Sequence, residues 1–220
     1  MRVISGIVAS PRRAGRWVLQ VDGRPAATLS IEGIERLGIR VGASYDARLA
    51  AAVEREAAVL GAFDTAVSIL AFRARSVRDV RRRLIDKGES EAVADAAIAR
   101  LESLGLLSDR EFARQFARSR VLGPGLSKRR LQQELFKRGV ARDVADEAIG
   151  EVMAEDDVDE DAIIDRVARK KLRTLAKLDP LTRRRRLYAF LARRGYEPDD
   201  IRRVMADLAA DDGDEPADVE

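Results

Sequence analysis

The chain of 220 residues contains neither cysteine nor histidine. Without cysteine it can form no disulfide and no thiolate metal site, which fits a reducing cytoplasm. Without histidine it lacks the commonest general base, the usual partner of a catalytic Ser or Cys, and the imidazole ligands of zinc. Magnesium chemistry based on carboxylates alone is the enzyme class that these absences leave open.

Aromatic residues make up only 5% of the sequence, and no apolar run is long enough to span a bilayer. The N-terminus also lacks the apolar core of a signal peptide. Trp17, Tyr188 and Tyr196 are the candidates for stacking on nucleic-acid bases, so recognition driven by stacking is not expected. We therefore expect a cytoplasmic protein that does not associate with membranes.

A glycine-rich phosphate loop is missing too. The segment Gly123-Pro-Gly125 follows a predicted helix instead of a strand, and no Lys-Ser/Thr pair follows it at the required place. It is interpreted as a flexible joint between helices. No cofactor is expected.

Charge is distributed unevenly along the chain, although the net charge is only +3. Residues 65–150 carry 18 basic and 12 acidic side chains, whereas residues 211–220 carry six acids and no base. The basic middle indicates a polyanion or an acidic protein surface as partner. Residues 211–220 are expected to be disordered and to compete with DNA for the basic residues.

One helix occurs three times in the sequence. The segment 75–88 (RSVRDVRRRLIDKG) returns as 126–139 (LSKRRLQQELFKRG) and, more loosely, as 182–195 (TRRRRLYAFLARRG). Each copy has an apolar stripe at i, i+4 spacing and ends on a basic residue followed by glycine, which suits a helix C-terminus. In the first two copies a serine is placed to cap the helix. Three copies of one helix predict a repeat architecture.

The sequence as a whole predicts a mainly α-helical fold of three tandem three-helix repeats, forming an elongated curved body after a small β-rich N-terminal module. The expected parts are the module (1–45), a connecting helix (46–64), three repeats (65–107, 108–154 and 155–210) and an acidic tail (211–220). Strands are expected at 2–10, 15–21 and 26–29, with a hairpin turn at Asp22-Gly23. Separate helices are expected at 47–60 and 66–74.

Basic side chains on the outward face of the repeated helix are the candidate binding residues. A solvated charged surface is the default interpretation of any one of them, but recurrence in successive repeats favours a binding surface. The candidates for contact with DNA or a protein partner are Arg78, Arg82, Lys128, Arg129, Arg130 and Arg185. By contrast, Lys87, Arg138 and Arg194 precede the terminal glycines and are expected to stabilise helix ends.

No catalytic or metal site is expected. Asp157, Asp159 and Asp161 alternate as in a calcium loop, but Ala162 stands where glycine is needed and Ala168 where glutamate is needed. Acids at a helix N-terminus explain this run better.

The sequence resembles the RecX family of bacterial regulatory proteins. The resemblance covers about residues 29–208 and is carried by three motifs: Arg75-Ser76…Val80…Leu84…Lys87-Gly88, 101–113 (LESLGLLSDREFA) and 125–140 (GLSKRRLQQELFKRGV). It implies a non-enzymatic modulator of the RecA recombinase that lies in the groove of the RecA–DNA filament and restrains ATP hydrolysis and strand exchange. It thereby implies a role in DNA recombination, repair and the SOS response. The third copy, with its run of arginines, and the acidic tail depart from the family pattern.

Three hypotheses follow from the sequence. The first is a monomeric regulator that binds the RecA filament on single- or double-stranded DNA through backbone contacts. The second is a general helical DNA-binding protein that acts without a recombinase. The third is a magnesium-dependent nuclease that uses the acids of 155–161.

Overall fold

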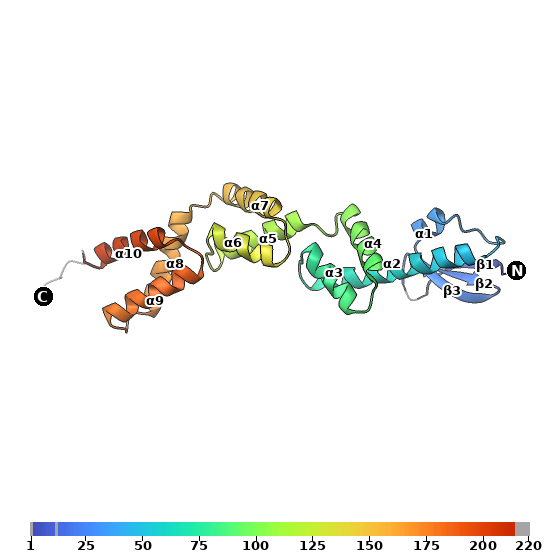
Figure 1. The fold of residues 1–220 in the computed structure, drawn as a ribbon, viewed down its shortest axis with the longest axis horizontal. Coiled ribbons are helices and arrows are strands. Elements are labelled where there is room, and N and C mark those ends of the chain that lie inside the picture. The colour runs from blue at the N-terminus through green and yellow to red at the C-terminus, as the bar shows by residue number, and fades with distance from the viewer. Residues whose placement is uncertain (1, 12, 214–220) are drawn as a thin grey trace. The chain divides into compact units, whose positions relative to one another are not determined.

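The computed structural model describes residues 2–11 and 13–213, and of residues 211–213 it describes the backbone only. Within this part of the chain, a three-stranded sheet is followed by ten α-helices (Figure 1). The chain divides into two compact units, Met1–Leu107 and Ser108–Glu220. The first unit contains the β module and the first repeat, and the second contains the other two repeats. The predicted fold class, mainly α with three-helix repeats behind a small β module, is confirmed.

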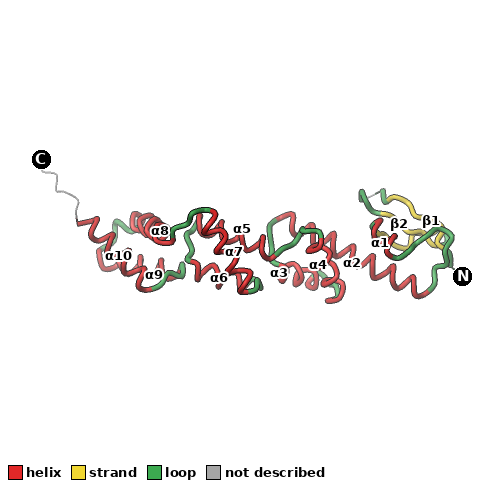
Figure 2. Tube along the Cα trace, turned by 90° about the horizontal axis from the view of Figure 1, so that it is seen from above, coloured by secondary structure: helices red, strands yellow, loops and turns green. Residues whose placement is uncertain are grey.

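The N-terminal module is an antiparallel sheet in the order β1-β2-β3, with strands β1 (Ile4–Ala9), β2 (Trp17–Val21) and β3 (Arg24–Leu29). Figure 2 shows all strands of the described chain in this module. Asp22 and Gly23 both have positive φ, 49° and 77°, as a tight turn between β2 and β3 requires. The predicted hairpin is therefore confirmed. Leu19 and Val21 are buried in the core of the module, to which Ile34 of α1 (Ile31–Arg36) also belongs.

A single 26-residue helix, α2 (Ala47–Phe72), replaces the two helices expected at 47–60 and 66–74. The predicted break was wrong because nothing at 61–65 stops a helix. A Cβ at Gly61 would meet no atom within 4 Å, so this glycine only lowers helix propensity. Thr65 donates its hydroxyl hydrogen to the Gly61 carbonyl at 2.9 Å, and Ser68 does the same to Asp64. The polar side chains thus bond back to the helix without ending it.

The three repeats share one pattern of helices. The C-terminal part of α2 leads into α3 (Val77–Asp86) and α4 (Glu91–Ser103). The second repeat consists of α5 (Asp109–Leu122), α6 (Lys128–Lys137) and α7 (Arg142–Glu155), and the third of α8 (Glu160–Thr174), α9 (Pro180–Arg193) and α10 (Pro198–Gly213). The helix that recurs in the sequence is the middle one of each repeat, α3, α6 and α9.

The ends of these middle helices agree with the sequence prediction. The Ser76 hydroxyl accepts a hydrogen bond from the Asp79 amide at 3.2 Å, and the Ser127 hydroxyl accepts one from the Arg130 amide at 3.2 Å. In the third copy, Asp179 takes over the capping role. Positive φ angles of 99°, 85° and 89° at the three terminal glycines show why this residue type recurs after each helix: Gly88, Gly139 and Gly195.

Apolar stripes on the repeated helix form the centre of each repeat. Val80 and Leu84 are completely buried within the first repeat. The corresponding pairs of α6 and α9 are Leu131 with Leu135 and Leu187 with Leu191, and both belong to one continuous core that joins the second and third repeats. The second unit is therefore held together by contacts between repeats, as expected for a repeat protein.

The C-terminal helix α10 extends to Gly213, further than the expected end at residue 209. Of the predicted disordered tail, residues 214–220 lie outside the described residues. Across the described ranges, every helix is too short or too polar to pass through a bilayer.

Candidate functional site

The structure places one exposed arginine at the same position of each middle helix. Arg78 of α3, Arg129 of α6 and Arg185 of α9 each lie ten residues before the glycine that follows their helix. All three side chains are exposed, because the apolar stripes beside them point into the cores. All three residues are among the candidates predicted from the sequence, and the helix geometry explains why they recur on the outward face.

The three arginines differ in their ionic partners. Arg129 forms an ion pair with Glu197, the residue that precedes α10. Arg78 and Arg185 form no ion pair with any residue that the structure describes. Two of the three equivalent guanidinium groups thus remain available for a partner, while the third is held by a carboxylate of the next repeat.

Arg82 lies one helical turn after Arg78 and shares the carboxylate of Asp79 with two other arginines. Asp79 accepts hydrogen bonds from Arg75 at 2.6 Å, from Arg82 at 2.7 Å and from Arg83 at 3.3 Å. Partial burial acts to raise the pKa of Asp79, but the hydrogen bonds from Arg75 and Arg83 outweigh it and hold the pKa below its usual value. The Arg82 side chain is 68% exposed, so its pair is weak and it can exchange Asp79 for another anion.

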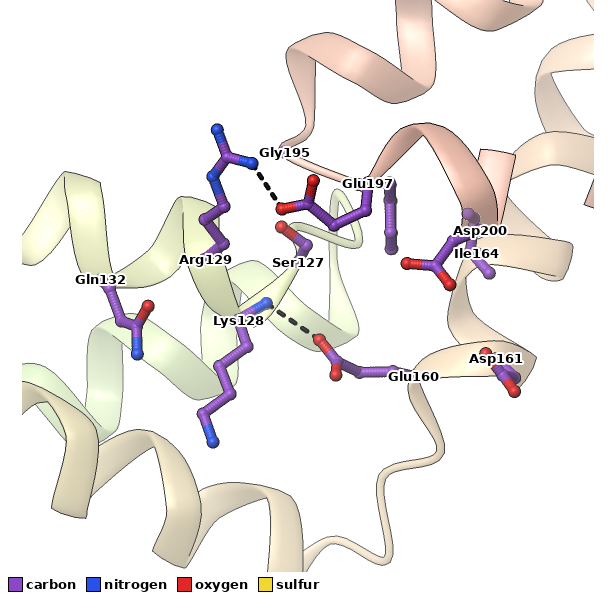
Figure 3. A pocket seen from close by; sticks show the side chains of 11 residues that line it. Ser127, Lys128, Arg129, Gln132, Glu160, Asp161, Ile164, Gly195, Glu197 and Asp200 are labelled. Atoms are coloured by element: carbon purple, nitrogen blue, oxygen red, sulfur yellow. Dashed lines mark hydrogen bonds and ion pairs between the residues drawn. The ribbon is translucent and has the colours of Figure 1, made fainter. Parts of the chain in front are cut away.

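The start of α6 gathers three of the candidates, Lys128, Arg129 and Arg130, without an acid in the first helical turn. Positive side chains are unfavourable there because the helix N-terminus is itself electropositive. Residues from the third repeat compensate: the Lys128 amide donates to Glu160 at 3.0 Å, and Arg129 pairs with Glu197. Figure 3 shows both contacts beside a cavity of about 320 Å³. Basic residues of the second repeat and acidic residues of the third line this cavity, so it lies at the junction between the two repeats.

The basic side chains of this cluster differ in whether an ion pair holds them. Arg130 pairs with Glu134 in its own helix at 2.8 Å. The Lys128 ammonium group points away from Glu160 and Glu197 (Figure 3) and has no ion pair with a described residue. Sequence reasoning missed Glu160 and Glu197, because both lie in another repeat and outside the recurring helix.

The residues before the terminal glycines lie at the helix ends, and the expected side-chain contact with a helix end is found at Arg138. Lys87, Arg138 and Arg194 are the C-cap residues of α3, α6 and α9. Arg138 donates to the Glu134 carbonyl at 2.6 Å, which satisfies an acceptor of the last helical turn. The Arg194 guanidinium lies 3.7 Å from the centre of the Phe190 ring. Partial burial of this guanidinium lowers the pKa of Arg194.

The segment 123–125 is held in place, which corrects its interpretation as a flexible joint. The Arg194 Nε donates to the Pro124 carbonyl at 2.7 Å, and the Ser127 amide donates to the Arg194 carbonyl at 3.1 Å. Gly125 is buried with a φ of 65°, and a Cβ there would lie 3.1 Å from a methyl group of Ile163. The prediction failed because glycine and proline indicate a turn but not whether another repeat packs on it.

The acidic run before α8 also has structural partners. Asp159 caps α8 by accepting from the Asp161 amide at 2.9 Å, and Asp161 pairs with Arg203 of α10. No group of three or more potential metal ligands lies together in the described ranges 2–11 and 13–213. These acids serve the start of the helix and the contact with α10.

This arrangement is suited to binding charged groups. Exposed guanidinium groups donate two parallel hydrogen bonds to a phosphate or a carboxylate. Of the candidates for base stacking, Tyr196 is buried and Trp17 half-buried, and only Tyr188 is exposed. The surface therefore fits the charged groups of a partner better than the faces of bases.

Comparison with known proteins identifies all three repeats. Family models described as the first, second and third three-helix domains of RecX match residues 62–101, 108–149 and 159–205. Regulatory protein RecX of Amycolatopsis mediterranei is 39% identical over 128 residues, covering 58% of this chain and 71% of the relative. That of Chlorobium phaeobacteroides is 36% identical over 144 residues, covering 66% of this chain and 91% of the relative.

Two solved structures have the same fold. A crystal structure of regulatory protein RecX superposes with a TM-score of 0.77 at 18% identity, covering 94% of this chain and all of the other. RecX from Lactobacillus salivarius superposes with a TM-score of 0.57 at 16% identity, covering 70% of this chain and 97% of the other. These likenesses establish the architecture of three-helix repeats independently of the sequence matches.

Proposed function

This chain belongs to the RecX family of regulatory proteins, and on that premise we propose that it binds the RecA recombinase filament on DNA. Bound there as a monomer in the cytoplasm, it restrains ATP hydrolysis and strand exchange by the recombinase. The protein itself carries out no reaction. Its relatives are named as regulatory proteins, and its charged clusters are helix caps and ion pairs.

The observation that carries this proposal is the exposed arginine at one position of each middle helix. Arg78, Arg129 and Arg185 do not contribute to the apolar cores, so folding alone does not explain their recurrence. A filament of DNA and protein repeats its phosphates and acidic side chains at regular intervals. A protein that repeats one guanidinium group along its chain can bind several of these anions at once.

The ion pairs around the candidates determine how each would contribute. Arg78 and Arg185 can bind an anion without losing an ion pair to a described residue. Arg129 must first leave Glu197, and Arg82 must leave Asp79. Because exposed pairs contribute only about 0–1 kcal/mol, this exchange is a small cost compared with several new contacts to a polyanion.

A general DNA-binding protein that acts without a recombinase is the alternative. The excess of basic over acidic residues at 65–150 favours it, because non-specific DNA binding depends on such charge. The two functions differ in one measurable respect. A filament regulator needs the recombinase for tight binding to DNA, whereas a general DNA-binding protein does not.

Co-sedimentation with single-stranded DNA, with and without RecA, tests the proposal together with the ATPase rate of the filament. We expect recombinase-dependent binding and a lower ATPase rate. Replacement of Arg78, Arg129 and Arg185 by alanine should weaken both effects and leave thermal stability unchanged. The control removes three exposed arginines at unrelated positions, Arg40, Arg142 and Arg173. Equal binding without recombinase, or an equal loss in both variants, would refute the proposal.

A further inference from the structure

A groove in the third repeat is lined by both apolar and basic side chains. It lies against α8, α9 and α10 and has a volume of about 920 Å³. Its apolar lining includes Leu181, Tyr188 and Met205, and its basic lining is Arg183, Arg184, Arg185 and Arg202. None of the described residues that line it is acidic.

Two apolar side chains of this groove, Leu181 and Tyr188, lie outside the core, whereas its other large apolar residues pack in that core or against it: Leu172, Leu187, Met205 and Leu208. Leu181 is 79% exposed and Tyr188 is 39% exposed, whereas Leu187, which also lines the groove, is buried. Arg184 and Arg185 form no ion pair with a described residue, and among the described residues Arg202 pairs with the exposed Asp199 in its own helix. The groove therefore combines the exposed apolar surface of Leu181 and Tyr188 with the guanidinium groups of Arg184 and Arg185, which form no ion pair with a described residue.

These properties define the chemistry of a ligand. Carboxylates or phosphates satisfy the arginines, but only a ligand with aliphatic groups also covers Leu181 and Met205. Nucleic acid would bind the arginines and stack on Tyr188, and would leave most of the apolar lining in water. An acidic peptide with an aliphatic side chain fits both parts of the groove.

We propose that the acidic C-terminal segment of this chain, residues 214–220, binds in this groove. The segment has the sequence DEPADVE, which contains four acids, no base and the aliphatic Val219. It is attached at the edge of the groove, because Ala209 lines the groove and α10 ends four residues later at Gly213. Seven residues can extend over about 23 Å, which is enough to turn back along α9.

This binding gives the groove a regulatory role that does not depend on the recombinase. The bound segment covers Arg184 and Arg185 and neutralises the basic side of α9. Because Arg185 is one of the three equivalent arginines, the third repeat is then masked in the free protein. A stronger polyanion can displace the segment, since all of its contacts with the arginines are electrostatic and screened by salt.

The absence of cysteine allows a direct test on the full chain. A nitroxide on Ala217→Cys labels a single site, and the NMR signals of methyl groups report which of them lie near it. We expect broadening of the Leu181 and Met205 methyl signals that fades at high salt and on addition of a short oligothymidylate. The matched control keeps the same label and tether but removes the charges: Asp214→Asn, Glu215→Gln, Asp218→Asn and Glu220→Gln.

Two further samples complete the test. The double variant Arg184→Glu/Arg185→Glu should lose the broadening while its circular dichroism stays that of the wild type. A mixture of labelled chains with methyl-enriched, unlabelled chains should show no broadening. The proposal is wrong if the charge-neutral tail broadens Leu181 and Met205 equally, because the tether alone then explains the effect. Broadening in the mixed sample would show binding between two copies and would also overturn it.

Discussion

The hydroxyl group of Tyr196 donates a hydrogen bond of 3.1 Å to the main-chain carbonyl of Gly125. This buried bond joins the segment after α9 to the segment before α6, 71 residues apart. Burial, together with the nearby carboxylate of Glu160, raises the pKa of Tyr196 to about 12. The contact between the second and third repeats therefore depends on a neutral phenol.

Replacing Tyr196 by phenylalanine should lower the free energy of unfolding by about 1 kcal/mol at pH 7, since it leaves the Gly125 carbonyl without its donor. The wild-type protein should also lose stability as the pH rises from about 10 to about 12. The unfolded tyrosine ionises first, so the stability contributed by the raised pKa is present below 10 and lost by 12. Denaturant unfolding at several pH values checks both effects.

The phenylalanine variant itself should show a smaller decline between pH 10 and 12, because it has one ionisable group fewer. Tyr188→Phe is the matched control, since this tyrosine is partly exposed and donates no hydrogen bond to a described residue. Identical pH profiles for wild type and Tyr196→Phe would contradict the assignment.

Gly125→Ala should destabilise the second unit by about 2–4 kcal/mol, because the new Cβ would clash with Val167 and Ile163 and would require a φ of 65°. Gly150→Ala in α7 is the control within the same unit. A Cβ there meets no atom within 4 Å, so alanine should be neutral or stabilise the helix by up to about 1 kcal/mol. Thermal unfolding distinguishes the two, and equal melting temperatures would show that the segment 123–125 is loose.

Asp79→Asn should reduce stability by about 1 kcal/mol at pH 7, because it removes the carboxylate shared by Arg75, Arg82 and Arg83. The pKa of Asp79 is lowered in the fold, so its contribution is present above the ordinary value of 3.8 and is lost as the pH falls through the lower folded value. The difference in free energy of unfolding between wild type and Asp79→Asn should therefore disappear at acidic pH.

The exposed Asp86, in the last turn of the same helix, provides the control for this pH titration. Asp86→Asn removes the same charge from the unfavourable end of the helix dipole, and it should leave stability unchanged or slightly higher. If wild type and Asp79→Asn still differ in free energy of unfolding below the pKa of Asp79 in both the folded and the unfolded state, the effect of the substitution comes from packing.

Glu197→Gln should tighten the binding of DNA at low salt roughly twofold, since it releases Arg129 from an exposed ion pair that contributes about 0.5 kcal/mol. Glu147→Gln removes an equal charge from an exposed pair with Arg110 in α5 and serves as the control. Fluorescence anisotropy with labelled single-stranded DNA measures both. The assignment of Arg129 fails if the two variants gain the same affinity, because net charge then explains the change.

The sequence was sufficient to predict the three repeats, because their signals are local. Helix caps, apolar stripes and terminal glycines act within one helix, and Ser76 and Gly88 do what their residue types favour. The contacts between repeats were not predictable in this way. Glu197 meets Arg129 across 68 residues, and no periodicity links the two.

At the candidate site, too, features within one helix were predictable and contacts between repeats were not. The outward positions of Arg78, Arg129 and Arg185 follow from the helical period, whereas the pairing of Arg129 with Glu197 depends on how the third repeat packs. The length of α2 was missed for a different reason. Gly61 weakens a helix in isolation, but buried neighbours such as Leu60 and Phe63 compensate for its low propensity.

Because α2 is one uninterrupted helix, it fixes how the core of the β module and the core of the first repeat are rotated relative to each other about the helix axis. Val53 of this helix belongs to the core of the β module, and Phe63 and Ala66 belong to the core of the first repeat. One residue inserted between them would turn the first repeat by about 100° relative to the β module. Insertions of one or two residues near Gly61 should therefore be far more damaging than those of seven, which restore the phase after nearly two full turns.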